Sequence, residues 1–192
     1  IAKFINLLGY SSIRMVLPYH DERGSFEKLN STKMVSANIG LTLRGLQQSV
    51  QDVISCVTWL EYQGYKKITI LGSSIGTCVA FLAAVHDDRI NGLFGNLISS
   101  YFGDVVLTGL STIHIKESID DYNNSAKNDM IVDVEVLRKF WLLNSPIAFV
   151  NKIKIYNPQL KIFIVSGKYD STFKMELTEK ILDELNKQSI PF

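Results

Sequence analysis

Cysteine is rare in this chain, and several features of specialised proteins are missing from it. Only Cys56 and Cys78 occur among the 192 residues, both in segments with a helical pattern, so we expect reduced thiols rather than a disulfide framework. No apolar run reaches the roughly 20 residues that a membrane-spanning helix requires. Lys and Arg number 20, and Asp and Glu number 19. Because the charges balance and no basic stripe stands out, nucleic acid is not an expected partner.

What remains is the composition of an ordinary globular domain. Hydrophobic residues make up 46% and charged residues 20% of the sequence. The length suits one domain, residues 1–192, with a substantial core. The chain starts at Ile1 on a helical pattern and stops at Phe192 just after another, so we interpret it as a piece cut at both ends. We expect a cytoplasmic location, although such cuts would hide any targeting signal.

Apolar residues alternate between the period of a strand and that of a helix. Strand-like runs are "IRMVLPY" (13–19), "KKITILG" (66–72), "GLFGNLISS" (92–100) and "KIFIVSG" (161–167), and helical runs lie at 46–65, 76–86 and 175–187. Strands separated by helices pair in parallel through right-handed crossovers. The sequence therefore predicts an α/β fold of three layers, α/β/α, in which helices cover both faces of a mostly parallel sheet.

The alternation breaks between about residues 100 and 152. This stretch mixes aromatic, polar and short helical pieces, among them "VEVLRKFWLL". We interpret it as a cap-like insertion over one end of the sheet, within the single domain. Its aromatic residues, including Tyr101 and Phe102, would line an apolar pocket, although ordinary packing against the sheet explains most residues of this kind.

The segment "LGSSIGTC" (71–78) stands where a strand passes directly into a helix. It contains the pattern G-x-S-x-G with Ser74 at its centre. The pattern alone is weak, but the preceding strand and the following helix are the context of a nucleophile elbow, a tight turn that projects a serine hydroxyl from a sheet edge. The alternatives are a Gly/Ser turn without chemistry and a phosphate-binding loop. The second lacks the Lys-Ser/Thr pair that such a loop requires.

Steric crowding explains why this turn contains two glycines. The reversal forces the central serine towards unfavourable backbone angles, so we expect a side chain at either Gly72 or Gly76 to collide with the turn. Ser74 would then stand at a helix N-terminus, and the N–H of Ile75 would point to where an oxyanion forms. Ser73 would border the same site.

A catalytic triad built on such a turn runs in the order Ser, then Asp or Glu, then His. Asp170 follows the strand at 161–167 and would lie at the same sheet edge as Ser74, where a carboxylate could orient an imidazole. The simpler alternative is that Asp170 caps the next helix.

The histidine of such a triad is the missing member. The chain has three histidines, and none follows His114. His20 comes directly after the strand-like run at 13–19 and is the one candidate for lining the site, whereas His86 and His114 fit surface positions. We therefore expect the catalytic base beyond Phe192.

Four segments together carry a family resemblance: "LPYHDERG", "GYKKITILGSSIGTCVAFLAAVHDDRI", "YFGDVVLTGLSTIHI" and "GKYDSTF". The chain resembles the α/β-hydrolase superfamily, and more narrowly the bacterial family related to the family-18 α/β-hydrolase-domain proteins. The resemblance implies Ser74 as nucleophile, Asp170 as acid and a histidine on a downstream loop. After the strand-like run that contains Asn96, the resemblance would imply an Asn-His pair, but Leu97 follows Asn96. Asn96 itself is a further candidate for lining the site.

Two kinds of function fit these observations. The first is a serine hydrolase that cleaves carboxylic esters or thioesters through an acyl-enzyme, with a small-molecule acyl substrate and with no cofactor and no metal. An acyltransferase using the same serine is its close variant. The second is a scaffold or binding module that keeps the fold without the chemistry, which the missing histidine favours. The oligomeric state does not follow from the sequence.

Overall fold

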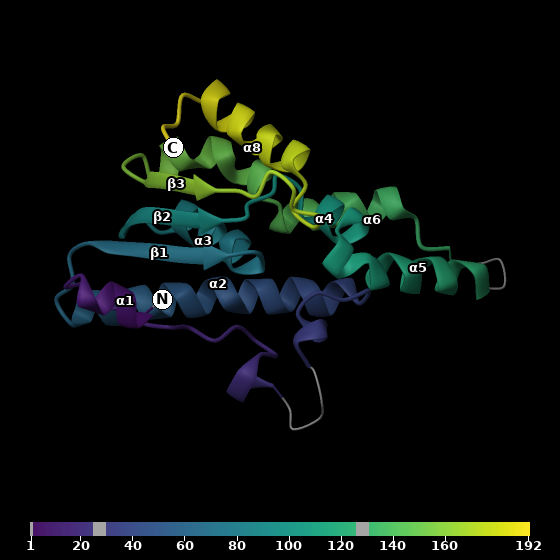
Figure 1. Cartoon of the computed structure of the whole chain (residues 1–192), viewed down its shortest axis with the longest axis horizontal. Coiled ribbons are helices and arrows are strands. Elements are labelled where there is room, and N and C mark those ends of the chain that lie inside the picture. The colour runs from purple at the N-terminus through teal and green to yellow at the C-terminus, as the bar shows by residue number, and fades with distance from the viewer. Residues whose placement is uncertain (1, 25–29, 126–130) are drawn as a thin grey trace.

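The computed structural model describes residues 2–24, 30–125 and 131–192 (Figure 1). Three parallel strands form one sheet in the order β1-β2-β3, with β1 at Ile68–Ser73, β2 at Ile90–Asn96 and β3 at Lys161–Val165. The last residues of the three strands, Ser73, Asn96 and Val165, stand in register. The carboxyl ends of all three strands therefore meet at one edge of the sheet.

Helices fill the connections between the strands. The α-helices are α1 (Ala2–Leu7), α2 (Ile39–Tyr62), α3 (Ile75–His86), α4 (Phe102–Thr108), α5 (Ile113–Ser125), α6 (Val134–Trp141), α7 (Ile153–Tyr156) and α8 (Met175–Lys187). Short 3₁₀ helices lie at Asp21–Arg23 (η1), Asn30–Lys33 (η2), Leu110–Thr112 (η3), Leu142–Asn144 (η4) and Pro146–Lys152 (η5). The α/β class and the parallel sheet predicted from the sequence are confirmed. In the described residues, no helix is long and apolar enough to cross a membrane.

The long helix α2 forms for reasons that are local to the sequence. The side chain of Asn38 caps its start, where Oδ1 accepts a hydrogen bond from the N–H of Leu41 at 3.0 Å. Leu46, Val53 and Val57 recur at helical spacing and are buried. The chain leaves the helix through Gly64, whose φ of 88° suits a residue without a side chain. The helix therefore has a defined start, a defined end and one face for the core.

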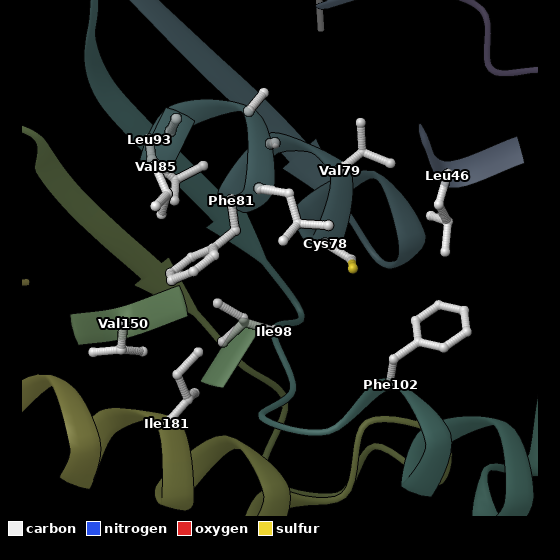
Figure 2. Close-up of a cluster of buried hydrophobic side chains, with 14 of the residues drawn as sticks. Leu46, Cys78, Val79, Phe81, Val85, Leu93, Ile98, Phe102, Val150 and Ile181 are labelled. Carbon is white, nitrogen blue, oxygen red and sulfur yellow. The ribbon is translucent and has the colours of Figure 1, made fainter. Parts of the chain in front are cut away.

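The core lies between the sheet and α3. This helix contacts β1 and β2 on one side and α2 on another, and its residues 77–85 are all buried. Phe81 of α3, Leu93 of β2 and Ile181 of α8 belong to one cluster of buried side chains (Figure 2). An apolar helix without a polar face is expected where neighbours surround it. Helix α3 is therefore the central support of the turn that precedes it.

The opposite face of the sheet is largely exposed. Leu71 of β1 is 46% exposed, and Phe163 and Val165 of β3 are 57% and 41% exposed. Phe94 of β2 stacks on Phe163, with 4.9 Å between the ring centroids. In the described ranges, helices therefore cover one face of the sheet more fully than the other, whereas the sequence analysis expected cover on both.

The prediction of a strand at 13–19 is wrong. These residues form no strand and pair with none of the three described strands. Their apolar pattern has another cause, because Pro18 is buried and Met15 and Leu17 pack against the core without joining the sheet. Tyr19 lies against Gly45 of α2. Burial does not alternate along the run, because residues 13 and 14 are exposed and residues 15–17 are all partly buried. The apolar composition of such a segment does not distinguish packing against the core from pairing in a sheet.

The side chain of Asn157 connects the end of α3 to the start of β2. Its side chain is fully buried, and Nδ2 donates to the backbone oxygens of Ala84 at 2.8 Å, Asp87 at 3.2 Å and Ile90 at 2.9 Å. These three carbonyls belong to the end of α3, the following turn and the start of β2. Buried carbonyls need a donor; the Asn157 amide donates to all three, and the Asp87 oxygen also accepts from the N–H of Ile90 at 3.1 Å.

Replacing Asn157 with alanine should therefore lower the free energy of unfolding by about 2–4 kcal/mol, because buried acceptors lose their donor and a cavity opens. Gln159→Ala is the matched control, since this exposed amide donates to the neighbouring Asp88 oxygen at 3.2 Å. We expect the control to change stability by less than about 0.5 kcal/mol. Urea unfolding measures both. Equal effects would contradict the role given to Asn157.

Candidate active site

Ser74 occupies the tip of a turn between β1 and α3. Its backbone has φ 55° and ψ −125°, a region that residues with side chains rarely adopt. Two hydrogen bonds hold it there: its N–H donates to the Asn96 oxygen at 2.9 Å, and its carbonyl accepts from the N–H of Thr77 at 2.8 Å. The hydroxyl of Thr77 donates to the same Asn96 oxygen at 2.7 Å. The strained serine is therefore fixed by the neighbouring strand end and by the first turn of α3.

The two glycines of the turn are not equivalent. A Cβ at Gly72 would lie 2.4 Å from the backbone oxygen of Gly76 and 2.6 Å from Cα of Thr77. A Cβ at Gly76 would meet nothing within 4 Å. The expected collision is therefore found at Gly72, and the expectation of one at Gly76 is wrong, because position 76 already points away from the turn. The close approach requires a glycine on the strand side alone.

The strand ends beside Ser74 are hydrogen-bonded to one another. Asn96 ends β2, and its Nδ2 donates to Oγ of Ser73 at 2.8 Å. Leu97 follows with φ 63° and donates its N–H to the Val165 oxygen of β3 at 2.8 Å. Asn96 thus supports the turn through its backbone and orients Ser73 through its side chain.

A cavity of about 160 Å³ opens beside Ser74. Its walls come from the elbow with α3, from the segment after β2 with α4 and η3, and from the segment after β3, and Val35 and Pro146 add to them from the segments before α2 and at the start of η5. The lining residues are Val35, Ser74, Ile75, Cys78, Leu97, Ser99, Phe102, Val105, Val106, Ser111, Thr112, Pro146, Thr172 and Phe173. Figure 1 shows α4, α5 and α6 beyond the carboxyl ends of the strands, on the side where this cavity lies.

The Ser74 hydroxyl differs from the other hydroxyls of the cavity wall. Thr172 donates to Ser111 at 3.0 Å, and the hydroxyls of Ser99 and Thr112 donate to backbone oxygens. Among the described residues, Ser74 is the one lining residue whose hydroxyl makes no hydrogen bond to the chain. Its side chain is thus available to a molecule in the cavity.

Asp170 lies in the loop after β3. Its Oδ1 accepts hydrogen bonds from the N–H groups of Thr172 at 2.8 Å and Phe173 at 2.6 Å. Both of these residues line the cavity, and Leu110 and Ser111 of η3 bind the same loop through their N–H groups. Oδ2 of Asp170 makes no hydrogen bond within the described residues. The carboxylate therefore organises its loop with one oxygen and leaves the other free.

The three histidines lie apart from the cavity lining. His20 stands before η1, and its Nδ1 is 2.9 Å from the Pro18 oxygen. His86 ends α3 beside Phe149 and Tyr156, and His114 is exposed on α5. None of the three is among the residues that line the cavity.

The remaining candidates, Phe102, Tyr101, Ser73 and Asn96, do not share one site. Phe102 lines the cavity and contacts Trp141 edge to face, at 6.4 Å between ring centroids. Tyr101 lines a separate surface depression with Arg138, and Ser73 is exposed on the open face of the sheet. Neither Tyr101, Ser73 nor Asn96 belongs to the cavity lining.

Sequence reasoning did not single out Cys78 as part of this site. Ser74 directly precedes α3 and Cys78 lies in the first turn of that helix, and both residues line the cavity. Burial raises the pKa of the Cys78 thiol to about 12, and Sγ donates to the Asn144 oxygen at 3.0 Å. Cys78 is therefore a neutral part of the wall, not a second nucleophile. The place of Cys78, four residues after Ser74, was the signal in the sequence.

Comparison with known proteins supports the fold. No protein-family model matches the sequence, and no curated protein matches it either. Among solved structures, a puromycin-hydrolysing peptidase from Mycobacterium tuberculosis is similar, with a TM-score of 0.55 and 15% identity over 73% of this chain. The match spans 20% of that protein's chain. At this identity the likeness establishes a shared fold, which this chain has in common with one part of a larger hydrolytic enzyme.

Proposed function

We propose that this chain is the nucleophile-bearing part of a serine hydrolase of the α/β-hydrolase superfamily, acting on carboxylic esters or thioesters. One observation carries the proposal: a serine held at positive φ between a strand and a helix presents an unpaired hydroxyl to a cavity. Strained backbone is costly and persists where the surrounding structure enforces it. A turn without chemistry has no need of that geometry.

The proposed chemistry begins with attack of Ser74 Oγ on the substrate's carbonyl carbon, while a base takes the hydroxyl proton. The carbonyl electron pair moves onto oxygen. Ile75 is the first residue of α3, so its N–H has no carbonyl one turn earlier in the helix and can donate to that oxyanion. Collapse of the intermediate expels the protonated alcohol or thiol, and water then releases the acid from the acyl-serine.

Asp170 fits the role of orienting an imidazole. Its Oδ1 accepts hydrogen bonds from two backbone N–H groups, and its Oδ2 is free to accept a hydrogen bond from the N–H of an imidazole ring. The sequence left helix capping as the alternative, but α8 begins after Lys174 without a side-chain cap, and both hydrogen bonds to Oδ1 of Asp170 come from the loop before that helix. The imidazole itself must come from somewhere other than the described positions of His20, His86 and His114.

The absence of these histidines from the cavity lining also favours the second candidate function, a binding module that keeps the fold without catalysis. The two candidates differ in one property, the reactivity of Ser74. Imidazole in solution can replace an absent histidine where the site has room for it, so an added base separates them. An acyltransferase would behave like the hydrolase in this respect, because both form the acyl-serine.

A fluorophosphonate probe, which phosphonylates activated serines, tests the proposal. We expect the chain to react slowly in ordinary buffer and roughly tenfold faster or more when imidazole is added, a part of the about 10²–10⁴ that a positioned base contributes. Labelling rates are read by gel fluorescence. Asp170→Asn should reduce the gain, because the carboxylate no longer orients the ring. A rate that does not respond to imidazole would support the binding module instead.

A further inference from the structure

The cavity beside Ser74 has the character of a site for an uncharged apolar group. No charged side chain is among its lining residues in the described part of the chain. Val105 and Val106 of α4, Leu97 after β2 and Phe173 after β3 contribute apolar surface. Figure 2 shows Cys78 of α3 and Phe102 of α4 reaching toward a common space from opposite sides. Apolar walls with few polar groups are typical of small-molecule sites.

Apart from the Ser74 hydroxyl, the side-chain polar groups of the wall are hydrogen-bonded within the chain. The hydroxyl of Thr172 donates to Ser111, that of Thr112 donates to the Val105 oxygen at 2.8 Å, and the Cys78 thiol donates to Asn144. A ligand with a charged end would find no counter-ion here, and burial of an unpaired charge is costly. The wall therefore selects against carboxylates and ammonium groups.

The volume of the cavity limits the size of the apolar group that it can hold. The cavity measures about 160 Å³, and a closed apolar cavity of about 150 Å³ is known to hold one benzene ring. A group of roughly six carbon atoms, linear, branched or aromatic, would fill it. Longer chains would have to extend into solvent.

We infer that this cavity binds the acyl part of the substrate, and that the substrate class is esters or thioesters of short, uncharged carboxylic acids up to about the size of a phenyl group. Val105 is a specificity-determining residue, because it belongs to the wall and a larger side chain there takes up the space. This inference rests on the proposed function, since it assigns the cavity to the molecule that Ser74 attacks.

The test uses binding, so that it does not depend on catalysis. Toluene is the neutral probe, benzoate is its charged counterpart of similar size, and 1-methylnaphthalene is the oversized probe. Each is titrated into the Ser74→Ala chain, and methyl NMR signals of Val105, Val106 and Leu97 report binding. We expect toluene to shift these signals and to bind at least tenfold more tightly than either other probe. Benzoate binding as tightly as toluene, or toluene shifting none of these signals, would overturn the inference.

A filled cavity provides the second arm. Val105→Phe should weaken toluene binding tenfold or more, whereas Val136→Phe, the same change at an exposed position of α6, should leave it unchanged. If Val105→Phe fails to fold, Val35→Phe fills the cavity from a different segment. Unchanged toluene binding in a folded, filled variant would overturn the inference. If toluene binds but Ser74 is never labelled, the proposed hydrolase function is wrong while the preference of the cavity for uncharged apolar groups still holds. Failure of the proposed function and failure of this inference are therefore distinguishable.

Discussion

Replacing Ser74 with alanine should reduce fluorophosphonate labelling of the chain to background, in the presence or absence of imidazole. The loss should be complete, because alanine has no side-chain oxygen to form the bond to phosphorus. Ser74 combines the enforced backbone geometry with the unpaired hydroxyl. The other hydroxyls of the wall are hydrogen-bonded, and Cys78 remains a neutral thiol.

Ser73→Ala is the matched control for this prediction. Ser73 is the neighbouring residue of the same type, but its hydroxyl accepts a hydrogen bond from Asn96 at 2.8 Å and lies outside the cavity lining. We expect this variant to keep most of the labelling, with a reduction of no more than a few-fold. A large loss in Ser73→Ala with little loss in Ser74→Ala would show that the reactive serine had been assigned to the wrong position.

Gly72→Ala should destabilise the chain by about 3–5 kcal/mol, which is among the larger effects of single substitutions. The added Cβ would lie 2.4 Å from the Gly76 oxygen and 2.6 Å from Cα of Thr77. These atoms belong to the backbone, so a side-chain rotation cannot relieve the overlap. The turn between β1 and α3 would have to open, and the support that α3 gives to the core would weaken with it. Urea unfolding measures the loss.

Gly76→Ala gives the opposite result in the same turn. Its Cβ meets nothing within 4 Å, and the residue is the second of α3. Alanine in a helix is favoured over glycine by about 1 kcal/mol, so the variant should be as stable as the parent or slightly more stable. Similar losses of stability in Gly72→Ala and Gly76→Ala would contradict this explanation. They would mean that the turn needs the backbone flexibility of glycine at both positions, and that the close contact at Gly72 is not what requires a glycine.

The elbow could be predicted from the sequence because its causes are local. A strand of β-branched residues, a G-x-S-x-G turn and an alanine-rich helix follow one another within twenty residues, and each reinforces the next. The steric demand at Gly72 follows from the turn itself. The position of Gly76 does not, because it depends on the direction of the first turn of α3.

Features that depend on distant parts of the chain were less predictable. The run at 13–19 has the composition of a strand, but pairing needs a neighbouring strand, and in the described residues its apolar side chains pack against the core without joining the sheet. The exposure of Leu71 and Phe163 likewise depends on what lies over that face and not on the strands themselves. The sequence made Tyr101 and Phe102 equal candidates for the cavity wall, because both are aromatic residues of the same segment. In the structure the two neighbours line different depressions.

The position of the phosphonyl adduct tests the central claim most directly. The chain is treated with the fluorophosphonate probe and imidazole, digested with protease, and the peptides are sequenced by tandem mass spectrometry. The account predicts one dominant adduct, carried by Ser74 in the peptide that contains "LGSSIGTC". An adduct on Ser73 or on a serine outside the elbow, or an unmodified elbow peptide after prolonged treatment, would contradict the assignment of Ser74 as the nucleophile.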